Sequence, residues 1–329
     1  MSAIASTVQT FFTEYLMRQR QASPHTIAAY RDLVRMLLFF AAERTGIACH
    51  QLQFTDVDAG LVTAFLDDLE HGRGNSVRTR NARLAGIHSL FGYAATHHPE
   101  HAEDIQRVLA IPAKRAEHTI ITYLTEAESE ALLAAPNRNT RTGRRDHALL
   151  QLAIQTGLRA SELTSLTRRD IHLGTGAHIR CRGKGRKHRI TPLTHGTVTV
   201  MRTWIRERTG DEDDPLFPTN RGSSMSPDAL AQRVRIHAST AARSCRSLAS
   251  KNVTPHVLRH TAAMRLLHAG VDTTVIALWL GHVDVTTTQI YLEADLVLKQ
   301  RALDRTTPPK ATPGRYRPPD QLIAFLEAL

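Results

Sequence analysis

The stretch from Thr254 to Tyr291 constrains this chain most, because it places polar side chains where helices begin and end. Thr254 is followed by proline, a pair that predicts a helix start, since threonine caps helix N-termini and proline fits the first helical position. On that helix His256, Arg259 and His260 are spaced i, i+3 and i+4, so they share one face. We therefore expect two imidazoles and a guanidinium on one side of this helix.

A second helix follows in the same stretch. Asp272 can cap its N-terminus, and Gly281 can end it in the left-handed conformation that glycine adopts most easily. His282 comes directly after that glycine, and Tyr291 stands nine residues further along the chain. Helix ends present side chains to a ligand better than they pack a core, so the stretch predicts a binding or catalytic site.

Composition narrows the class of partner. The 329 residues are enough for two domains, each with its own core. Lys and Arg number 42 against 31 Asp and Glu, a net charge of +11. That surplus favours nucleic acid as a partner first and an anionic membrane surface second. The three cysteines indicate neither a disulfide framework nor a zinc ribbon. No signal peptide and no long apolar run is present, so we expect a soluble, cytoplasmic protein that binds no membrane.

The first hundred residues predict helices only. Ser23 and Pro24 begin one helix, residues 55–69 have the helical apolar period, and Ser76 caps a third helix. The first turns of that third helix are basic and its later turns apolar, which is typical of a helix that contacts a phosphate backbone. A solvated basic face is the alternative. The three basic residues of these turns are Arg78, Arg80 and Arg83.

The helical pattern breaks after residue 111, where we place an interdomain linker over residues 113–120 that includes Lys114 and Arg115. A second domain then begins with a capping box at Thr125. Its buried helix, residues 146–155, ends before Gly157. Arg159 follows two residues after that glycine, and a helix restarts at Ala160. Arg159 therefore stands at a turn between helices, although an ordinary ion pair with Glu162 would also explain it.

One strand pair is predicted, Ala177–Arg182 with Lys187–Leu193. The residues between them form a tight glycine-containing hairpin. Lys184 lies between two glycines at its tip, so it can swing a positive charge into a groove. A solvated surface turn is the alternative. The fold class expected from all these elements is mainly α, with a small β-hairpin in the second domain.

These motifs form an ordered set that resembles the tyrosine recombinase (phage integrase) family. The set is TGLRASEL around Arg159, RGKGRKHRITPL around Lys184, HVLRHT, LGH and Tyr291, and it matches the active-site pattern of the family at every position. SPHTIAAYRDL at 23–33 and the basic helix near 76–94 resemble the N-terminal, SAM-like core-binding domain of the family, and residues 120–300 its catalytic domain. The resemblance implies a two-domain, C-shaped clamp around DNA.

The resemblance also implies a division into residues 1–112 as the DNA-binding domain, 113–120 as the linker and 121–304 as the catalytic domain. The implied catalytic residues are Arg159, Lys184, His256, Arg259, His282 and Tyr291, supported by Glu162 and His260. The basic residues expected to contact DNA are Arg78, Arg80, Arg83, Lys114, Arg115, Arg186 and Lys187.

The chemistry of these residues suits exchange of one phosphodiester for another. Tyr291 is the nucleophile that would retain the bond energy as a 3′-phosphotyrosyl link. Arg159 and Arg259 offer planar donors to the non-bridging oxygens, and His282 adds a hydrogen bond to them. His256 can handle the tyrosine proton because imidazole titrates near neutrality. By the resemblance, Lys184 protonates the departing 5′ oxygen.

No metal or nucleotide cofactor is expected. The chain has no cluster of Asp and Glu near these motifs that would hold paired magnesium ions. His256, His260 and His282 have the side chains to bind zinc, but the adjacent arginines would repel a cation.

Three functions share this sequence pattern. The first is a site-specific recombinase or integrase from a mobile element, monomeric in solution and tetrameric on two DNA sites with inverted repeats. The others are a type IB topoisomerase and a DNA-binding regulator that has lost its chemistry, against which the intact catalytic set argues. The tail favours the first: residues 305–319 are proline-rich, and the apolar helix predicted at 320–329 is too short to be stable without a groove. By the resemblance, this helix docks on a neighbouring subunit.

Overall fold

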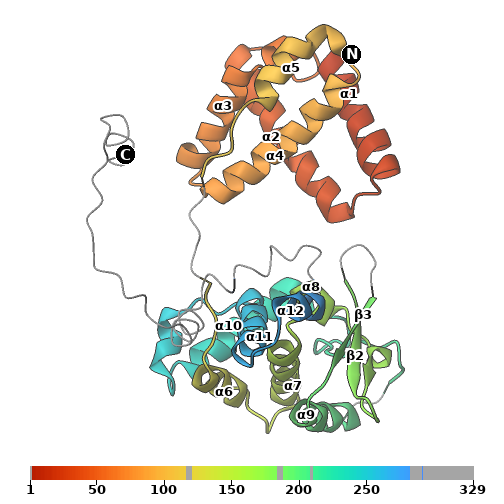
Figure 1. Ribbon diagram of the computed structural model, residues 1–329, viewed down its shortest axis with the longest axis vertical. Coiled ribbons are helices and arrows are strands. Elements are labelled where there is room, and N and C mark those ends of the chain that lie inside the picture. The colour runs from red at the N-terminus through yellow and green to blue at the C-terminus, as the bar shows by residue number, and fades with distance from the viewer. Residues whose placement is uncertain (1, 116–120, 184–187, 208–209, 282–290, 292–329) are drawn as a thin grey trace, which may run out of the picture. The chain divides into compact units, whose positions relative to one another are not determined.

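The structure is a computed structural model that describes residues 2–115, 121–183, 188–207, 210–281 and 291 (Figure 1). The chain divides into two compact units, Met1–Thr119 and Ile120–Leu329. The described residues are mainly helical with a small antiparallel sheet, as predicted. None of the described helices is long and apolar enough to cross a membrane. The proline-rich segment and the predicted C-terminal helix lie outside the described residues.

The smaller unit consists of helices in its described part. They are α1 (Ala3–Thr10), its π-helical continuation Phe11–Gln19, α2 (Pro24–Thr45), α3 (Ala59–Asp67), its π-helical continuation Asp68–Gly72, α4 (Val77–Ala95) and α5 (Ala102–Leu109). Ser23 and Ser76 cap α2 and α4 through their side chains, which confirms both predicted starts. The helix predicted from residue 55 begins later, because Asp58 caps it by accepting a hydrogen bond from the Leu61 N–H.

The core of this unit forms where α4 packs against α2, α3 and α5. Phe11, Phe65 and Phe91 are fully buried in it. Gly86 allows α4 to approach α2 closely, because a Cβ at this position would lie 2.3 Å from Leu33 Cδ2. The apolar half of the predicted basic helix is therefore a core element, as its sequence pattern indicates.

The larger unit contains the remaining elements. Its helices are α6 (Glu126–Ala134), α7 (Arg141–Thr156), α8 (Ala160–Thr164), α9 (His195–Arg206), α10 (Pro227–Ala241), α11 (Pro255–His268) and α12 (Thr273–Leu280). The capping box at Thr125 and the cap at Thr254 are present as predicted. α7 begins five residues before the predicted start, because the Thr140 side chain accepts a hydrogen bond from the Gly143 N–H.

The sheet has three strands in the order β1 (Ile171–His172), β2 (His178–Arg182) and β3 (His188–Pro192), all antiparallel. The predicted strand pair is confirmed within a residue at the ends that are described. The sequence pattern missed β1, because two residues are too few to show an alternation. Lys184, Arg186 and Lys187 at the hairpin tip lie outside the described residues.

α7 is the central helix of the larger unit, and it packs against α6, α9 and α11. Most of its residues are buried, in a core that includes Trp204 of α9 and Leu258 of α11. α12 packs in turn against α11. This packing brings the C-terminal end of α7 close to α11 and α12 (Figure 1), and the described residues Arg159, Arg259 and Tyr291 lie around this junction.

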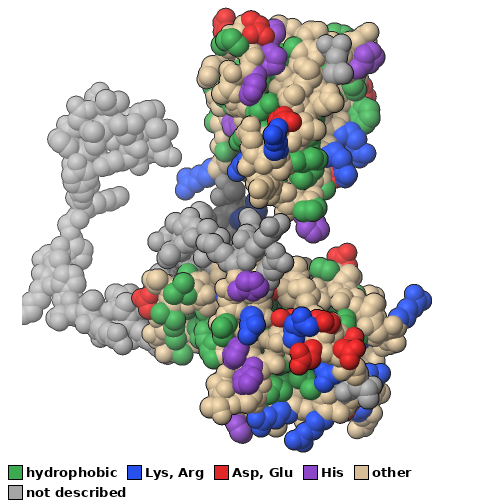
Figure 2. Space-filling model, turned by 90° about the vertical axis from the view of Figure 1, so that its right-hand side faces the viewer, with side chains coloured by type: hydrophobic (Ala, Val, Ile, Leu, Met, Phe, Trp, Pro, Cys, Tyr) green, Lys and Arg blue, Asp and Glu red, His purple; other side chains and the backbone are tan. Residues whose placement is uncertain are grey.

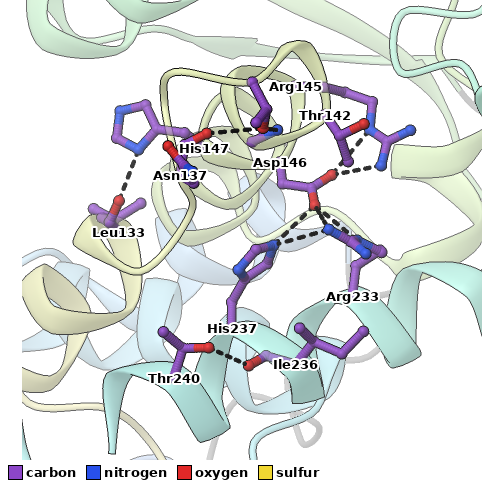
Figure 3. A network of polar contacts seen from close by, with 12 residues as sticks. Leu133, Asn137, Thr142, Arg145, Asp146, His147, Arg233, Ile236, His237 and Thr240 are labelled. Atoms are coloured by element: carbon purple, nitrogen blue, oxygen red, sulfur yellow. Dashed lines mark hydrogen bonds and ion pairs between the residues drawn. The ribbon is translucent and has the colours of Figure 1, made fainter. Parts of the chain in front are cut away.

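A buried carboxylate ties α7 to α10 (Figure 3). Asp146 of α7 is 1% exposed, and its Oδ1 accepts hydrogen bonds from Nε and Nη2 of Arg145 at 2.9 and 2.7 Å. Its Oδ2 lies 2.8 Å from Nε2 of His237 and 2.7 Å from Nε of Arg233, both on α10. Arg145 also donates to the carbonyl of Pro218 at 2.8 Å. Burial alone would raise the pKa of Asp146, but the hydrogen bond from His237 and the two guanidinium charges lower it.

We expect Asp146→Asn to destabilise the larger unit by about 3 kcal/mol, because the substitution leaves buried cationic partners without their counter-charge. Urea unfolding followed by tryptophan fluorescence measures this, since both tryptophans of the chain, Trp204 and Trp279, lie in this unit. Asp228→Asn, an exposed change on α10, is the control and should leave stability within about 0.5 kcal/mol of the parent.

The same pair of proteins tests the pH dependence of this carboxylate. The folded-state pKa of Asp146 is lowered, so its stabilisation is present above the ordinary aspartate value of about 4 and is lost as the pH falls below it. The stability difference between parent and Asp146→Asn should therefore shrink below pH 4. A difference that stays constant from pH 7 to pH 3 would contradict this account.

Candidate active site

Arg159 stands at the start of α8, directly after the turn made by Gly157. Its backbone N–H donates to Glu162 Oε2 at 2.8 Å, and its Nη1 donates to Glu162 Oε1 at 3.0 Å. Its Nη2 donates to the carbonyl of Gly281 at 3.0 Å, across to the end of α12. The ion pair that the sequence also allowed is thus present, and the hydrogen bond to Gly281 joins the partly exposed guanidinium to the end of α12.

Arg259 of α11 reaches the same place from the other side. Its side chain is buried, with Nη1 donating to the carbonyl of Gly157 at 2.7 Å and Nη2 to the carbonyl of Leu280 at 2.8 Å. Burial, together with the charges of Arg159 and Arg189, lowers the pKa of Arg259 to about 10. The guanidinium therefore remains charged at neutral pH, and the structure brings the two predicted phosphate-binding arginines together at the last carbonyls of α12.

Tyr291 lies beside this arginine pair. It is 1% exposed and packs in an apolar cluster with Met264 of α11 and Leu280 of α12. Its hydroxyl lies 3.0 Å from Nδ1 of His260, and the two rings meet edge to face. Burial raises the pKa of Tyr291, and the charge of Arg259 counteracts part of this effect.

The two histidines of α11 differ in their environment. His260 is partly buried against the tyrosine, whereas His256 is exposed, with its ring centroid 6.4 Å from that of His260. Burial, with the charges of His256 and Arg259, lowers the pKa of His260 to about 4. At neutral pH His260 is therefore uncharged. The sequence reasoning gave the tyrosine proton to His256 and a supporting role to His260, but the contact to the hydroxyl belongs to His260.

The predicted DNA-contacting residues of the smaller unit fall into two groups. Arg78 and Arg115 are exposed and available to a phosphate. Arg80 is not, because it is 3% exposed and its Nη1 donates to the carbonyl of Pro112 at 3.4 Å. Arg80 thus stays a predicted DNA contact whose side chain is buried in this structure, beside the chain segment that leaves the unit. Lys114 pairs with Glu70 at 2.8 Å, and Arg83 donates to the carbonyl of Ala29 at 3.4 Å.

Two predicted catalytic residues, Lys184 and His282, lie outside the described residues, as do Arg186 and Lys187. One residue of the site was missed by the sequence reasoning. Arg189 of β3 donates from Nη2 to Glu162 Oε2 at 2.9 Å and from Nη1 to the carbonyl of Leu280. The strand pattern contains a signal for it. Arg189 and the buried Thr191 are two residues apart, so both side chains lie on the inward face of β3. A charged residue on an inward face indicates a role beyond packing.

We expect the low pKa of His260 to make the larger unit sensitive to mild acid. The unfolded chain takes up a proton at an ordinary histidine pKa near 6.5, and the folded unit takes it up only near pH 4, so stability falls between these values. Between pH 7 and pH 5 the parent should lose about 2 kcal/mol more than His260→Gln. Urea unfolding at both pH values, followed by tryptophan fluorescence, checks this. Equal pH dependence in the two proteins would contradict it.

Comparisons with known proteins identify the family of this chain. A family model described as the phage integrase family matches residues 122–296, and one described as the phage integrase N-terminal SAM-like domain matches residues 10–98. The putative integrase/recombinase y4rC of Sinorhizobium fredii is 52% identical over 328 residues, which cover 100% of this chain and 99% of that protein. The tyrosine recombinase XerC of Pelobacter propionicus is 33% identical over 311 residues, covering 92% and 95% respectively.

Solved structures share the fold. The Tn1549 transposon integrase in complex with a circular intermediate DNA has a TM-score of 0.69 at 18% identity, over 93% of this chain and 100% of that chain. The XerH site-specific recombinase bound to a palindromic difH substrate has a TM-score of 0.66 at 23% identity, over 87% and 81%. The family models, the near full-length relatives and the site together make this chain a member of the tyrosine recombinase (phage integrase) family, whose members cleave and rejoin DNA.

Proposed function

We propose that this protein is a site-specific DNA recombinase of a mobile element that cleaves each strand through a 3′-phosphotyrosyl intermediate on Tyr291. One observation carries the proposal: the guanidinium groups of Arg159 and Arg259 are anchored on adjacent carbonyls at the end of α12, next to the tyrosine. Two planar donors and one phenol in one place are what phosphoryl transfer to tyrosine requires.

In the proposed reaction the Tyr291 oxygen attacks the phosphorus, and the bond from phosphorus to the 5′ oxygen breaks. The products are the 3′-phosphotyrosyl link and a 5′ hydroxyl, so one proton passes from the phenol to the neutral imidazole of His260, whose Nδ1 lies 3.0 Å from the hydroxyl, and a second proton reaches the departing oxygen. We assign that second proton to Lys184 and a hydrogen bond to a non-bridging oxygen to His282, both by their place in the family pattern. Attack by a 5′ hydroxyl from a second duplex reverses the step and exchanges the strands.

Both arginines donate to carbonyl oxygens of the chain itself. A non-bridging phosphate oxygen is negatively charged, so it forms a stronger hydrogen bond with a guanidinium than a neutral carbonyl oxygen does. We therefore expect an incoming phosphate to replace some of these carbonyl partners, because the new hydrogen bonds are stronger than those they replace. Tyr291 is 1% exposed, so the reaction also requires its hydroxyl to leave its present position.

We propose double-stranded DNA with inverted-repeat core sites as the partner, bound by a tetramer that forms from monomers on two sites in the cytoplasm. Lys and Arg side chains are visible on the surface of both units in the face shown in Figure 2. Together with the net charge of +11, they favour binding to a polyanion. Among the predicted contacts, the exposed Arg78 and Arg115 are the best placed for phosphate contact.

We expect Tyr291→Phe to abolish covalent attachment to DNA while changing DNA affinity less than about threefold, because the substitution removes the nucleophilic oxygen and no phosphate contact. Attachment is measured on a nicked duplex by denaturing gel electrophoresis and affinity by fluorescence anisotropy. His268→Gln, on α11 but not among the proposed catalytic residues, serves as the control for changes to this helix. A covalent complex formed by the phenylalanine variant would exclude Tyr291 as the nucleophile.

We expect deletion of residues 305–329 to leave DNA cleavage intact but to stop strand exchange between two duplexes. The proline-rich segment 305–319 can span roughly 45 Å when extended, at about 3.1 Å per residue, which is enough to reach a neighbouring subunit. Its apolar helix 320–329 would then bury side chains that it cannot bury alone. Strand exchange on paired full sites and synapsis by light scattering are the measurements. Full exchange by the truncated protein would show that the tail does not link subunits, and cleavage with no exchange by the complete chain would favour a topoisomerase.

A further inference from the structure

Arg189 connects the anchoring points of the two phosphate-binding arginines. Its Nη2 donates to Glu162 Oε2 at 2.9 Å, and the other oxygen of that carboxylate accepts from Arg159 at 3.0 Å. Its Nη1 donates to the carbonyl of Leu280, which also accepts from Arg259 at 2.8 Å. The guanidinium of Arg189 therefore contacts Glu162, which binds Arg159, and the Leu280 carbonyl, which binds Arg259.

The surroundings of Arg189 keep it in that place. Its side chain is 12% exposed and that of Glu162 is 4% exposed, so water competes little for these hydrogen bonds. Its Nε is buried and has no hydrogen-bond partner among the described residues. Both Nη groups are engaged, and a side chain held at both ends and buried between them has a fixed position.

Gly281 makes the approach of Arg189 possible. Its φ of +67° is in the left-handed region, and a Cβ on this residue would lie 2.4 Å from Arg189 Nη1. A side chain here would therefore displace the guanidinium as well as strain the backbone. The glycine that precedes His282 thus serves the position of Arg189 in addition to ending α12.

The positive charges of the three arginines explain why the bridge made by Arg189 is useful. Arg159, Arg189 and Arg259 are three like charges around one carboxylate, and the charges of Arg159 and Arg189 contribute to the lowered pKa of Arg259. Like charges repel each other, so partners of opposite charge that they share stabilise the group. The carboxylate of Glu162 and the negative end of the α12 dipole supply them.

We infer that Arg189 is a positioning residue for DNA cleavage, which sets the spacing of Arg159 and Arg259 by bridging Glu162 and the Leu280 carbonyl. This inference rests on the proposed function, because it concerns how the two arginines meet a phosphate. A lysine at this position keeps the positive charge but offers a single ammonium group in place of the planar fork. It cannot replace both ends of the bridge, and a displacement of about 1 Å at a reacting group costs on the order of a hundredfold in rate.

The test compares the parent, Arg189→Lys and a matched control, Arg206→Gln, which removes a charge from an exposed position at the end of α9. The substrate is a nicked duplex selected from a random pool by covalent attachment to the parent protein. Three quantities are measured: the single-turnover cleavage rate, the DNA dissociation constant and urea unfolding followed by tryptophan fluorescence. We expect Arg189→Lys to cleave tenfold to about a hundredfold more slowly, with DNA affinity within about threefold of the parent and with the protein still folded under the assay conditions, as its urea transition shows. Arg206→Gln should match the parent in all three.

A second comparison separates positioning from direct phosphate contact. If Arg189 acts through Arg159, then Arg189→Lys should slow cleavage by a smaller factor in an Arg159→Ala background than in the parent. Equal factors in the two backgrounds would overturn the inference, as would a parental cleavage rate for Arg189→Lys. A slower rate accompanied by a matching loss of DNA affinity or of folding would also overturn it, by making Arg189 a purely structural residue. Failure of the parent to attach to any duplex would refute the proposed function instead.

Discussion

The described part of the candidate active site depends on the C-terminal end of α12. The last carbonyls of an α-helix have no partner within the helix and carry the negative end of its dipole. Here the carbonyl of Leu280 accepts from Arg189 and Arg259, and that of Gly281 accepts from Arg159. A single helix end thus supplies an electrostatic partner for three guanidinium groups that gather in a partly buried place.

The side chains and carbonyls that meet at that helix end come from different elements of the fold. α7 ends at Gly157, whose carbonyl holds Arg259, and the next helix begins at Arg159. The indole of Trp279 on α12 donates to the carbonyl of Thr156 at 3.1 Å, so α12 is fixed to the same turn. The sheet contributes Arg189 from β3, and α11 contributes both Arg259 and the histidine that contacts Tyr291. The site is therefore a junction of helix ends, supported by a buried central helix.

A second buried polar network lies at the other end of that central helix. Asp146, near the start of α7, binds Arg145 and two side chains of α10. In each of the two networks, one carboxylate is shared among several cationic side chains. The consequences of the two networks differ. Glu162 fixes groups that we propose to bind phosphate, whereas Asp146 fixes the position of one helix against another. Both acidic residues are buried, and both belong to ion-pair networks that would be costly to break.

The sequence by itself determined the features that depend on neighbours a few residues apart. Caps at Ser76, Thr125 and Thr254 and the left-handed end of α12 at Gly281 follow from local hydrogen bonds and backbone preferences. The order and spacing of the motifs also sufficed for the family, because several short motifs in one order are far more specific than any of them alone. The start of α7 and the two-residue strand β1 were missed, since neither has enough apolar alternation to show.

Only the tertiary structure decided which partners those side chains have. The bond between Arg189 and Leu280 joins residues 91 positions apart, and that between Asp146 and His237 joins residues equally far apart. The contact of His260 with Tyr291 spans 31 positions. The buried Arg80 likewise donates to a carbonyl 32 positions away. A local pattern specifies residue type and secondary structure, but the partner of a charged group depends on which distant backbone and side-chain atoms the packing brings within hydrogen-bond distance.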